Sequence, residues 1–117
     1  MIAWSLTLQA GISFNLICSQ IMPPDQVPDE RYLVLRVDLD AGKFCIDDCR
    51  SILPIKSTSK TEIIFQDETT PKGSIVRRVN RETGDYYLLE KASIISMERR
   101  GECTVAPFTG FTSTPSE

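Results

Sequence analysis

The amino-acid sequence predicts an all-β protein, a small antiparallel meander of about six strands that forms a sandwich or half-barrel and is stabilised by disulfide bonds. Three observations lead to this fold class. Between Arg31 and Cys103, apolar and polar side chains alternate at the strand period, and no convincing helical period occurs. Asn, Asp, Gly and Pro separate the alternating runs at short intervals, as turns do. The chain of 117 residues contains four cysteines, which favours structural disulfides in a single domain with a modest core.

Residues 1–19 carry no charged side chain and are rich in Ile, Leu, Phe and Trp. This segment is similar to the apolar core of a secretory signal, with Ile17, Cys18 and Ser19 as a tolerable small-residue cleavage site before Gln20. A strand is the alternative, because apolar residues alternate with others from Ile2 to Ala10. The favoured interpretation is a signal-like segment at 1–19, an acidic proline-containing linker at 20–30, one β domain at 31–111 and a tail at 112–117.

The first expected strand follows Arg31, with Leu33, Leu35, Val37 and Leu39 on one face. The segment 38–42 then forms a turn, and a second strand begins at Lys43. Asp38, Asp40 and Gly42 only faintly fit a calcium loop, because Cys49 stands where the bidentate Glu belongs. A plain hairpin turn is therefore expected.

Short strands follow. Pro54 confines the segment 52–55 to a sheet edge or to a segment outside the ladder. Residues 57–59 read as a turn, and residues 61–66 as a strand. Residues 92–97 form a further strand, which the segment 99–101 is expected to terminate.

Residues 74–90 form the clearest element, a β-hairpin in which two strand-forming runs flank the turn Asn80–Gly84. Asn80 can bond forward to the backbone and open a type I turn, and Gly84 can take the left-handed conformation that returns the chain to the ladder. Arg77 and Arg78 must face opposite sides, and so must Tyr86 and Tyr87, so that one tyrosine is expected in the core and one at the surface.

The C-terminal segment Pro107–Phe111 carries two aromatics around a Thr-Gly pair, which is unusual for a disordered tail. We expect Phe108 and Phe111 to fold back and plug one end of the sheet. A partner-binding patch is the alternative.

Cys45, Cys49 and Cys103 are the disulfide candidates, since Cys18 would leave with a signal. A bridge between Cys45 and Cys49 or a bridge to Cys103 is possible on spacing, and the bridge to Cys103 is preferred because it ties the last strand to an early loop. Disulfides indicate an oxidising compartment and hence a periplasmic or secreted protein. After processing, no stable membrane span is expected.

Several function classes are disfavoured by composition. The sequence has no histidine, which removes the commonest general base and zinc ligand, so neither an enzyme nor a metal or cofactor site is predicted. A carboxylate-based enzyme would have to use Asp38, Asp40, Asp47 and Asp48. The net charge of −3 gives no reason to expect nucleic-acid binding.

The candidate binding residues lie on and beside the hairpin. Arg78 and Arg81, together with Arg99 or Arg100, can line a basic strip. A solvated face in which these arginines pair with Glu82, Glu90 and Glu98 is the simpler explanation. The resemblance of the segment 83–87 to the inhibitory loop of periplasmic inhibitors of C-type lysozyme implies Thr83, Gly84 and Tyr87 as further binding residues.

Two resemblances concern function. Four motifs together, Phe44-Cys-x-x-x-Cys49, Val79-Asn-Arg-x-Thr-Gly-x-Tyr86, Gly101-x-Cys103 and Pro107-Phe-x-Gly-Phe111, resemble small exported β-proteins of proteobacteria, which implies export and a β fold. The stretch Thr83-Gly84-Asp85-Tyr86-Tyr87 is similar to the Ser-Gly-x-x-Tyr loop of periplasmic inhibitors of C-type lysozyme, with Thr in place of Ser.

The function expected from the sequence is that of an exported, non-enzymatic β-domain that acts as a binding or envelope-interaction module for an unknown protein or envelope ligand. A lysozyme-inhibitor-like protein is the alternative binding function.

Overall fold

Nine β-strands make up one antiparallel sheet in the computed structural model, which describes residues 13–20 and 29–111. The strands are β1 (Ser13–Gln20), β2 (Asp29–Asp38), β3 (Lys43–Ile46), β4 (Leu53–Pro54), β5 (Ser57–Thr58), β6 (Glu62–Thr70), β7 (Gly73–Asn80), β8 (Asp85–Ala92) and β9 (Ile95–Ala106). Their order across the sheet is β4-β3-β2-β1-β9-β8-β7-β6-β5. The all-β fold and the antiparallel half-barrel are confirmed, with nine strands rather than about six.

The sheet curls because its two edge strands are neighbours in the chain. β4 and β5 lie at opposite edges, yet residues 55–56 alone connect them. A residue spans at most about 3.6 Å of extended chain, so the two edges must approach each other. Pro54 lies in edge strand β4, as expected for a residue that cannot donate to a ladder.

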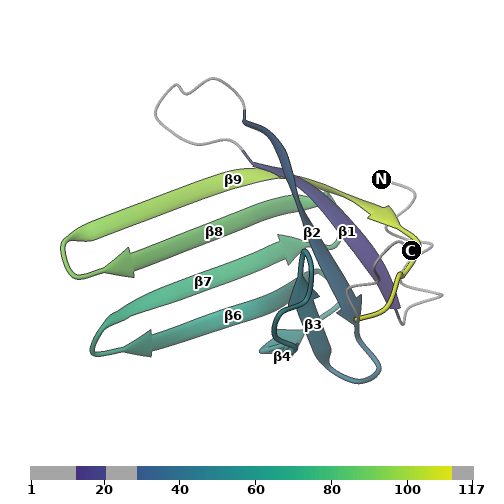
Figure 1. The fold of residues 1–117 in the computed structure, drawn as a ribbon, viewed down its shortest axis with the longest axis horizontal. Helices are drawn as coiled ribbons and strands as arrows, with labels where there is room; N and C mark the ends of the chain where they lie inside the picture. Colours follow the sequence, from purple (N-terminus) through teal and green to yellow (C-terminus); the bar gives the residue numbers. More distant parts are fainter. Residues whose placement is uncertain (1–12, 21–28, 112–117) are drawn as a thin grey trace.

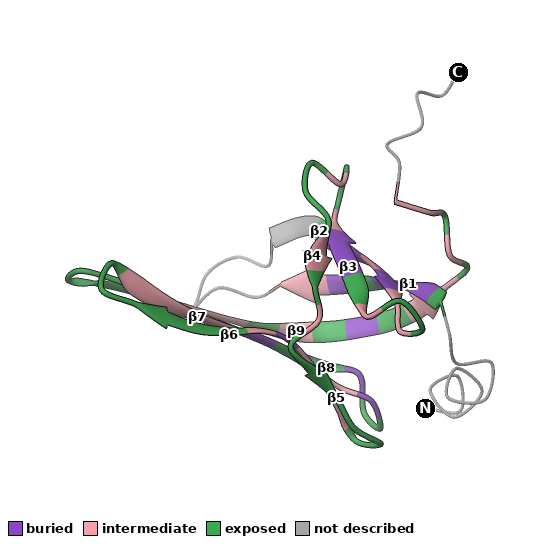
Figure 2. Cartoon of the chain, turned by 90° about the horizontal axis from the view of Figure 1, so that it is seen from below, coloured by how far each residue is buried: buried purple, intermediate pink, exposed green. Residues whose placement is uncertain are grey.

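The core lies where the two halves of the sheet face each other. Figure 1 shows β1, β2 and β3 crossing over one end of the long layer formed by β6, β7, β8 and β9. The buried residues gather at this crossing, and the far ends of the long hairpins extend beyond it (Figure 2). Phe44 of β3 contacts Phe65 of β6 at 4.8 Å between ring centroids, which joins the two halves through the core. Leu35, Val37 and Val79 are also fully buried in this cluster.

Strand β1 lies in the middle of the sheet, between β2 and β9. Leu16 and Cys18 have no exposed surface, so this strand supplies core residues. The cleavage point expected after Ser19 falls inside β1. The segment from Ile2 to Ala10, whose alternation favoured a strand, lies outside the described residues. Residues 1–12 lie outside the described part of the chain, as does most of the expected linker.

Strand β9 continues through the segment that was expected to end it. It pairs with β8 as far as Glu102 and then with β1 from Cys103 to Ala106. Gly101 allows this change of partner, because a Cβ on its backbone would lie 1.8 Å from the carbonyl oxygen of Ser19. The prediction that residues 99–101 terminate the strand is therefore wrong, and Gly101 marks a close approach of two backbones.

Two disulfides connect the chain, Cys18–Cys103 and Cys45–Cys49. The preference for a bridge from Cys103 to an early loop cysteine is wrong, because Cys103 lies directly opposite Cys18 in the β1–β9 ladder. Sequence reasoning missed this pair since it assigned Cys18 to a removed segment. The local Cys45–Cys49 bridge was one of the two possibilities left open.

The hairpin of β7 and β8 is confirmed in detail. Asn80 Oδ1 accepts hydrogen bonds from the backbone N–H groups of Glu82 and Thr83, and Gly84 has a φ of +83°. The segment 38–42 likewise forms the turn between β2 and β3, with the Ala41 N–H donating to Asp38 Oδ1.

The segment 107–111 lies against β1 and β2 on the face away from the core. Thr109 exchanges hydrogen bonds with Asn15, and Arg36 donates to the carbonyl oxygen of Gly110. Phe108 and Phe111 contact each other edge to face at 5.5 Å and stay half-buried. The described residues contain no helix that could span a membrane.

Candidate functional site

A line of three large polar side chains crosses the outer face of the long layer. In the β7–β8–β9 register, Arg78 lies opposite Tyr87, and Tyr87 lies opposite Arg100. Side chains directly opposite each other in an antiparallel pair lie on the same face, about 5 Å apart at Cβ. The sheet therefore places an aromatic ring between two guanidinium groups.

The ring of Tyr87 makes two cation–π contacts. The guanidinium carbons of Arg78 and Arg100 each lie 4.8 Å from the ring centroid. Because the two arginines come from the strands on either side of β8, both faces of the ring are covered. Each such contact at an exposed site contributes about 0.5–1 kcal/mol, so the stack orders the guanidinium groups before any partner arrives.

Two glutamates close the ends of this stack. Glu62 forms an ion pair with Arg78 Nε at 3.5 Å, and Glu98 forms one with Arg100 Nη2 at 3.3 Å. The hydroxyl of Tyr87 also donates to Glu98 at 2.9 Å. Exposed ion pairs contribute about 0–1 kcal/mol each, so these contacts orient side chains more than they stabilise the fold. We call these five residues, Glu62, Arg78, Tyr87, Glu98 and Arg100, the outer cluster.

A cleft of about 430 Å³ opens beside the outer cluster. Arg78, Arg100 and Tyr87 line it, and Asn80 and Asp85 form its rim near the hairpin turn. The ring faces of Tyr87 are occupied, so a partner meets guanidinium N–H donors and carboxylate acceptors rather than an open aromatic platform. This surface is suited to a partner that carries carboxylates, carbonyl groups and amines.

The hydrogen bond to Glu98 raises the pKa of the Tyr87 hydroxyl above its ordinary value, and burial and the negative charge of Glu98 add to that effect. Arg100 and Arg78 act in the opposite direction on this pKa. Tyr87 is therefore a neutral donor throughout the physiological range.

The structure brings together only some of the predicted binding residues. Arg78 and Tyr87 lie in the outer cluster. Arg81 does not, because its side chain is buried and its Nη1 donates to the carbonyl oxygen of Ser59. Thr83 and Gly84 lie in the adjacent turn, where Thr83 Oγ1 accepts a hydrogen bond from the Asp85 N–H. Burial of Arg81 lowers the pKa of its guanidinium from the ordinary value.

Glu62 was not predicted as a member of the cluster from the sequence, and Arg99 and Arg100 were alternatives for the basic strip. Arg100 shares the outer face with Arg78, whereas Arg99 lies on the opposite, inner face with Leu88. The alternation of faces separates Arg99 from Arg100, but only the pairing register shows which of them joins Tyr87.

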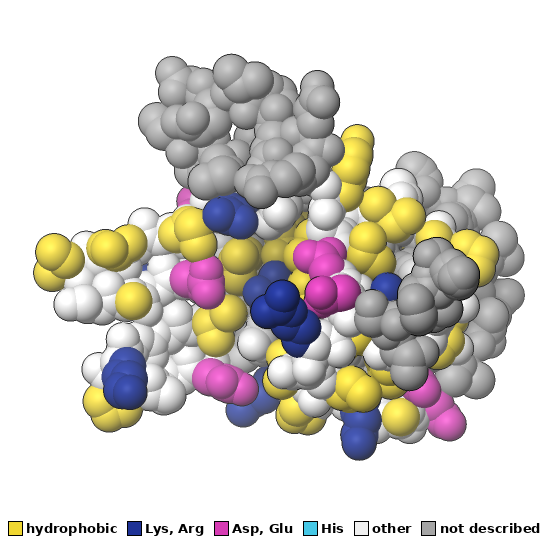
Figure 3. Space-filling view, viewed as in Figure 1, with side chains coloured by type: hydrophobic (Ala, Val, Ile, Leu, Met, Phe, Trp, Pro, Cys, Tyr) yellow, Lys and Arg dark blue, Asp and Glu magenta, His cyan; other side chains and the backbone are white. Residues whose placement is uncertain are grey.

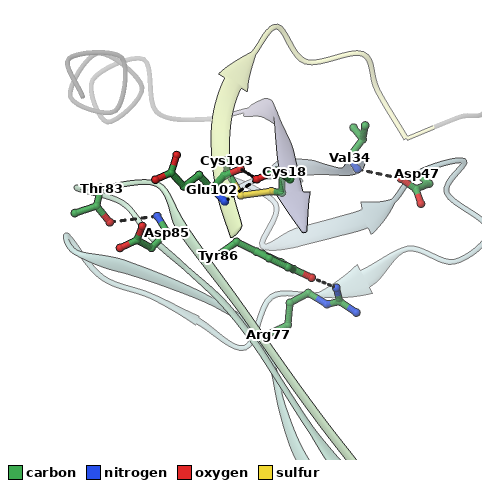
Figure 4. The surroundings of a disulfide bond; sticks show 10 residues. Cys18, Val34, Asp47, Arg77, Thr83, Asp85, Tyr86, Glu102 and Cys103 are labelled. Carbon is green, nitrogen blue, oxygen red and sulfur yellow. Dashed lines mark hydrogen bonds between the residues drawn. A yellow bond between two sulfur atoms is a disulfide. The ribbon is translucent and has the colours of Figure 1, made fainter. Parts of the chain in front are cut away.

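The motif that resembles the lysozyme-inhibitor loop is divided between core and surface. Tyr86 is 1% exposed, and its hydroxyl accepts a hydrogen bond from Arg77 Nη1 at 2.7 Å. Figure 4 shows the ring of Tyr86 extending below the Cys18–Cys103 bridge toward Arg77. Thr83 and Asp85 are exposed at the turn.

The four aspartates considered for acid–base chemistry lie at two ends of one hairpin. Asp38 is the last residue of β2, and Asp40 lies in the turn between β2 and β3. Asp47 and Asp48 follow the other end of β3, where Asp47 Oδ1 accepts the Val34 N–H and Asp48 pairs with exposed Arg50. β3 has four residues, so roughly 10 Å of strand separates the two pairs.

The fold and the site together define a disulfide-stabilised all-β domain with a polar cleft on one face of its sheet. Comparisons of this chain with protein-family models, with curated proteins and with solved structures found no match.

Proposed function

We propose that this chain is an exported, non-enzymatic β-domain that binds a protein partner of the cell envelope through the outer cluster. The observation that carries this proposal is the half-buried ring of Tyr87 held between Arg78 and Arg100 on the outer face of the sheet. Tyrosine and arginine are enriched among the residues that contribute most to protein–protein binding energy. A stack that is already ordered loses less side-chain entropy when a partner binds.

Two disulfides support export, because disulfides persist in oxidising compartments such as the periplasm or the extracellular space. The resemblance of the sequence motifs to small exported β-proteins of proteobacteria supports the same location. Under this proposal, any removed leader must end before Ser13, since cleavage after Ser19 would discard a central strand and Cys18.

A protein partner fits the chemistry of the cleft better than a nucleic acid. The cleft is lined by Arg78 and Arg100 but also by Glu62 and Asp85, so the charges of its lining balance. A phosphate backbone requires a net positive surface. A protein surface supplies both carboxylates and amines and can pair with both signs of charge.

Photo-crosslinking tests this proposal. A benzoylphenylalanine at position 85, on the exposed rim of the cleft, is expected to capture a protein in cells of the source organism. The same group at position 43, exposed on β3, serves as the control. Adding Tyr87→Ala should abolish the adduct, since loss of a central aromatic weakens binding by about 2 kcal/mol or more. Equal capture from both positions, or an adduct that survives Tyr87→Ala, would contradict the proposal.

Lysozyme inhibition is the alternative binding function, and purified protein in a turbidity assay of cell-wall lysis tests it directly. We expect no inhibition, because Tyr86 is committed to the core and the faces of Tyr87 are covered. If the wild type does inhibit, and if Thr83→Ala with Tyr87→Ala abolishes inhibition while the fold is retained, the inhibitor function replaces the one proposed here.

A further inference from the structure

A second cleft, of about 370 Å³, opens on the inner face of the sheet, on the side opposite the outer cluster. Its volume falls within the range of small-molecule sites. Buried Leu33 and Leu88 belong to its lining, with Tyr32 exposed at its edge. Four charged residues also line it: Arg77, Arg99, Glu90 and Asp47. Figure 3, viewed as in Figure 1, shows basic and acidic side chains intermixed with apolar ones on this side of the molecule.

Arg77 is a buried cation whose hydrogen-bond partners are neutral. Its side chain is 9% exposed, its Nε donates to Gln66 Oε1 at 2.8 Å, and its Nη1 donates to the hydroxyl of Tyr86. None of the ion pairs among the described residues involves Arg77. Burying a charge is costly unless an opposite charge offsets it, and a ligand carboxylate in this cleft would do so.

Arg99 supplies a second guanidinium to the same cleft. Arg77, Leu88 and Arg99 lie in register across β7, β8 and β9, so the two arginines stand on either side of an apolar floor residue. Arg99 Nη1 makes a long hydrogen bond of 3.4 Å to Gln20 Oε1, and its buried Nε has no hydrogen-bond partner. Its donor capacity is therefore largely unused.

Among the described residues, the acids of the cleft form no ion pair with these arginines. Glu90 and Asp47 take part in none of the ion pairs among the described residues, although both line the same space. Asp47 accepts the Val34 N–H through one oxygen, which leaves its other oxygen available (Figure 4). Both signs of charge thus border the cleft without pairing across it.

From this arrangement we infer that the inner cleft binds a small zwitterion with an apolar side chain, such as an amino acid or a short peptide. The carboxylate of the ligand faces Arg77 and Arg99, its ammonium group faces Glu90 and Asp47, and its side chain rests on Leu88 and Leu33. This site is separate from the outer cluster and does not depend on the function proposed for that cluster.

Titration of the oxidised, full-length protein with three matched probes tests the inference. L-leucine carries both charges, N-acetyl-L-leucine lacks the ammonium group, and L-leucinamide lacks the carboxylate. In ¹⁵N-resolved NMR spectra, we expect L-leucine to shift the Nε–Hε signals of Arg77 and Arg99 saturably. Each single-charge probe should bind about tenfold or more weakly, since a hydrogen bond to a charged group is lost.

Substitutions then test which side chains of the cleft bind the carboxylate and the ammonium group of the ligand. Arg99→Gln should weaken the binding of L-leucine about tenfold or more and reduce the preference for L-leucine over L-leucinamide, because Arg77 still faces the carboxylate. Glu90→Gln should reduce the preference for L-leucine over N-acetyl-L-leucine, because Asp47 still faces the ammonium group. Arg100→Gln is the matched control, because the neighbouring residue points to the outer face and should leave L-leucine binding unchanged.

Three results would overturn the inference. The first is the absence of any saturable shift with L-leucine. The second is equal binding of all three probes, which would mean that the charges do not contribute. The third is an equal loss of binding in Arg99→Gln and in Arg100→Gln. None of these results bears on the crosslinking experiment at position 85, so the two proposals stand or fall separately.

Discussion

At the scale of single residues, Gly101 decides how two strands meet. Its missing side chain lets the backbone of β9 pass directly over the carbonyl group of Ser19 in β1. A glycine in a strand interior usually weakens the strand, so its presence indicates a position where no Cβ fits.

Gly101→Ala should therefore lower the free energy of unfolding by about 2–3 kcal/mol, since the added methyl group must displace backbone rather than a flexible side chain. Urea denaturation measures this loss. Glu102→Ala, at the exposed neighbouring position, is the control and should change stability little. Equal losses of stability in the two variants would mean that the backbone of Gly101 does not lie close to the carbonyl group of Ser19.

Tyr87 offers a second test at this scale. Because its hydroxyl donates to Glu98, the pKa of Tyr87 is raised from 10.0 in the folded protein. The folded state then holds the phenolic proton more tightly than the unfolded state. The resulting stabilisation is complete below about pH 10 and is lost as the pH rises through the folded pKa.

Glu98→Ala should lower the pKa of Tyr87, because it removes the acceptor and leaves two arginines beside the ring. A pH titration followed by NMR at the tyrosine Cζ carbon measures the change. Glu102→Ala, on the same strand and face, should leave this pKa in place. An unchanged titration in Glu98→Ala would show that the hydrogen bond does not form in solution.

At the scale of the elements, β1 is the strand on which the architecture depends. It connects the half formed by β2, β3 and β4 to the half formed by β5 through β9. Without it, Leu35 and Cys103 would lose packing neighbours on a central strand, and both halves would expose an unpaired edge.

A chain that begins at Gln20 should therefore fail to fold, whereas a chain that begins at Ser13 retains all nine described strands. Circular dichroism and NMR dispersion of the two truncated proteins, each expressed under oxidising conditions, distinguish these outcomes. A folded chain from Gln20 would support removal of residues 1–19 as a signal and would contradict the position of β1.

At the scale of the whole molecule, the two disulfides act over very different lengths of chain. Cys18–Cys103 spans a sequence separation of 85 at the junction of the two halves, and Cys45–Cys49 closes a loop with a separation of 4. The entropy that a cross-link removes from the unfolded chain grows with the length of the loop it closes.

Replacing Cys18 and Cys103 together with serine should therefore lower stability by about 4–5 kcal/mol, and replacing Cys45 and Cys49 together by about 2 kcal/mol. Denaturation of the two double variants measures the difference, and non-reducing peptide mapping should recover both pairs from the wild type. A map that joins Cys103 to Cys45 or Cys49 would contradict the strand register at β1 and β9.

Local patterns determined much of this fold. Alternation and turn residues predicted the hairpin of β7 and β8 and the turn at residues 38–42, because these features depend on neighbouring residues. They also limited Pro54 to a sheet edge or to a segment outside the ladder, and the structure has it at an edge. Alternation also separated Arg77 from Arg78 and placed one of Tyr86 and Tyr87 in the core. For the candidate site, the charge distribution along the chain pointed to Arg78, and the resemblance to the lysozyme-inhibitor loop pointed to Tyr87.

Contacts between distant segments needed the tertiary structure. Whether Ser13–Gln20 is a leader or a central strand depends on its pairing with β9, which lies far along the chain, as well as with β2. The register of β1 and β9 pairs Cys18 with Cys103, and the register of β8 and β9 selects Arg100 rather than Arg99 for the outer cluster. Arg81 is buried in the hairpin turn, where its Nη1 donates to the carbonyl oxygen of Ser59. A strand's own sequence determines which side chains share a face, whereas the strand beside it determines what those side chains meet.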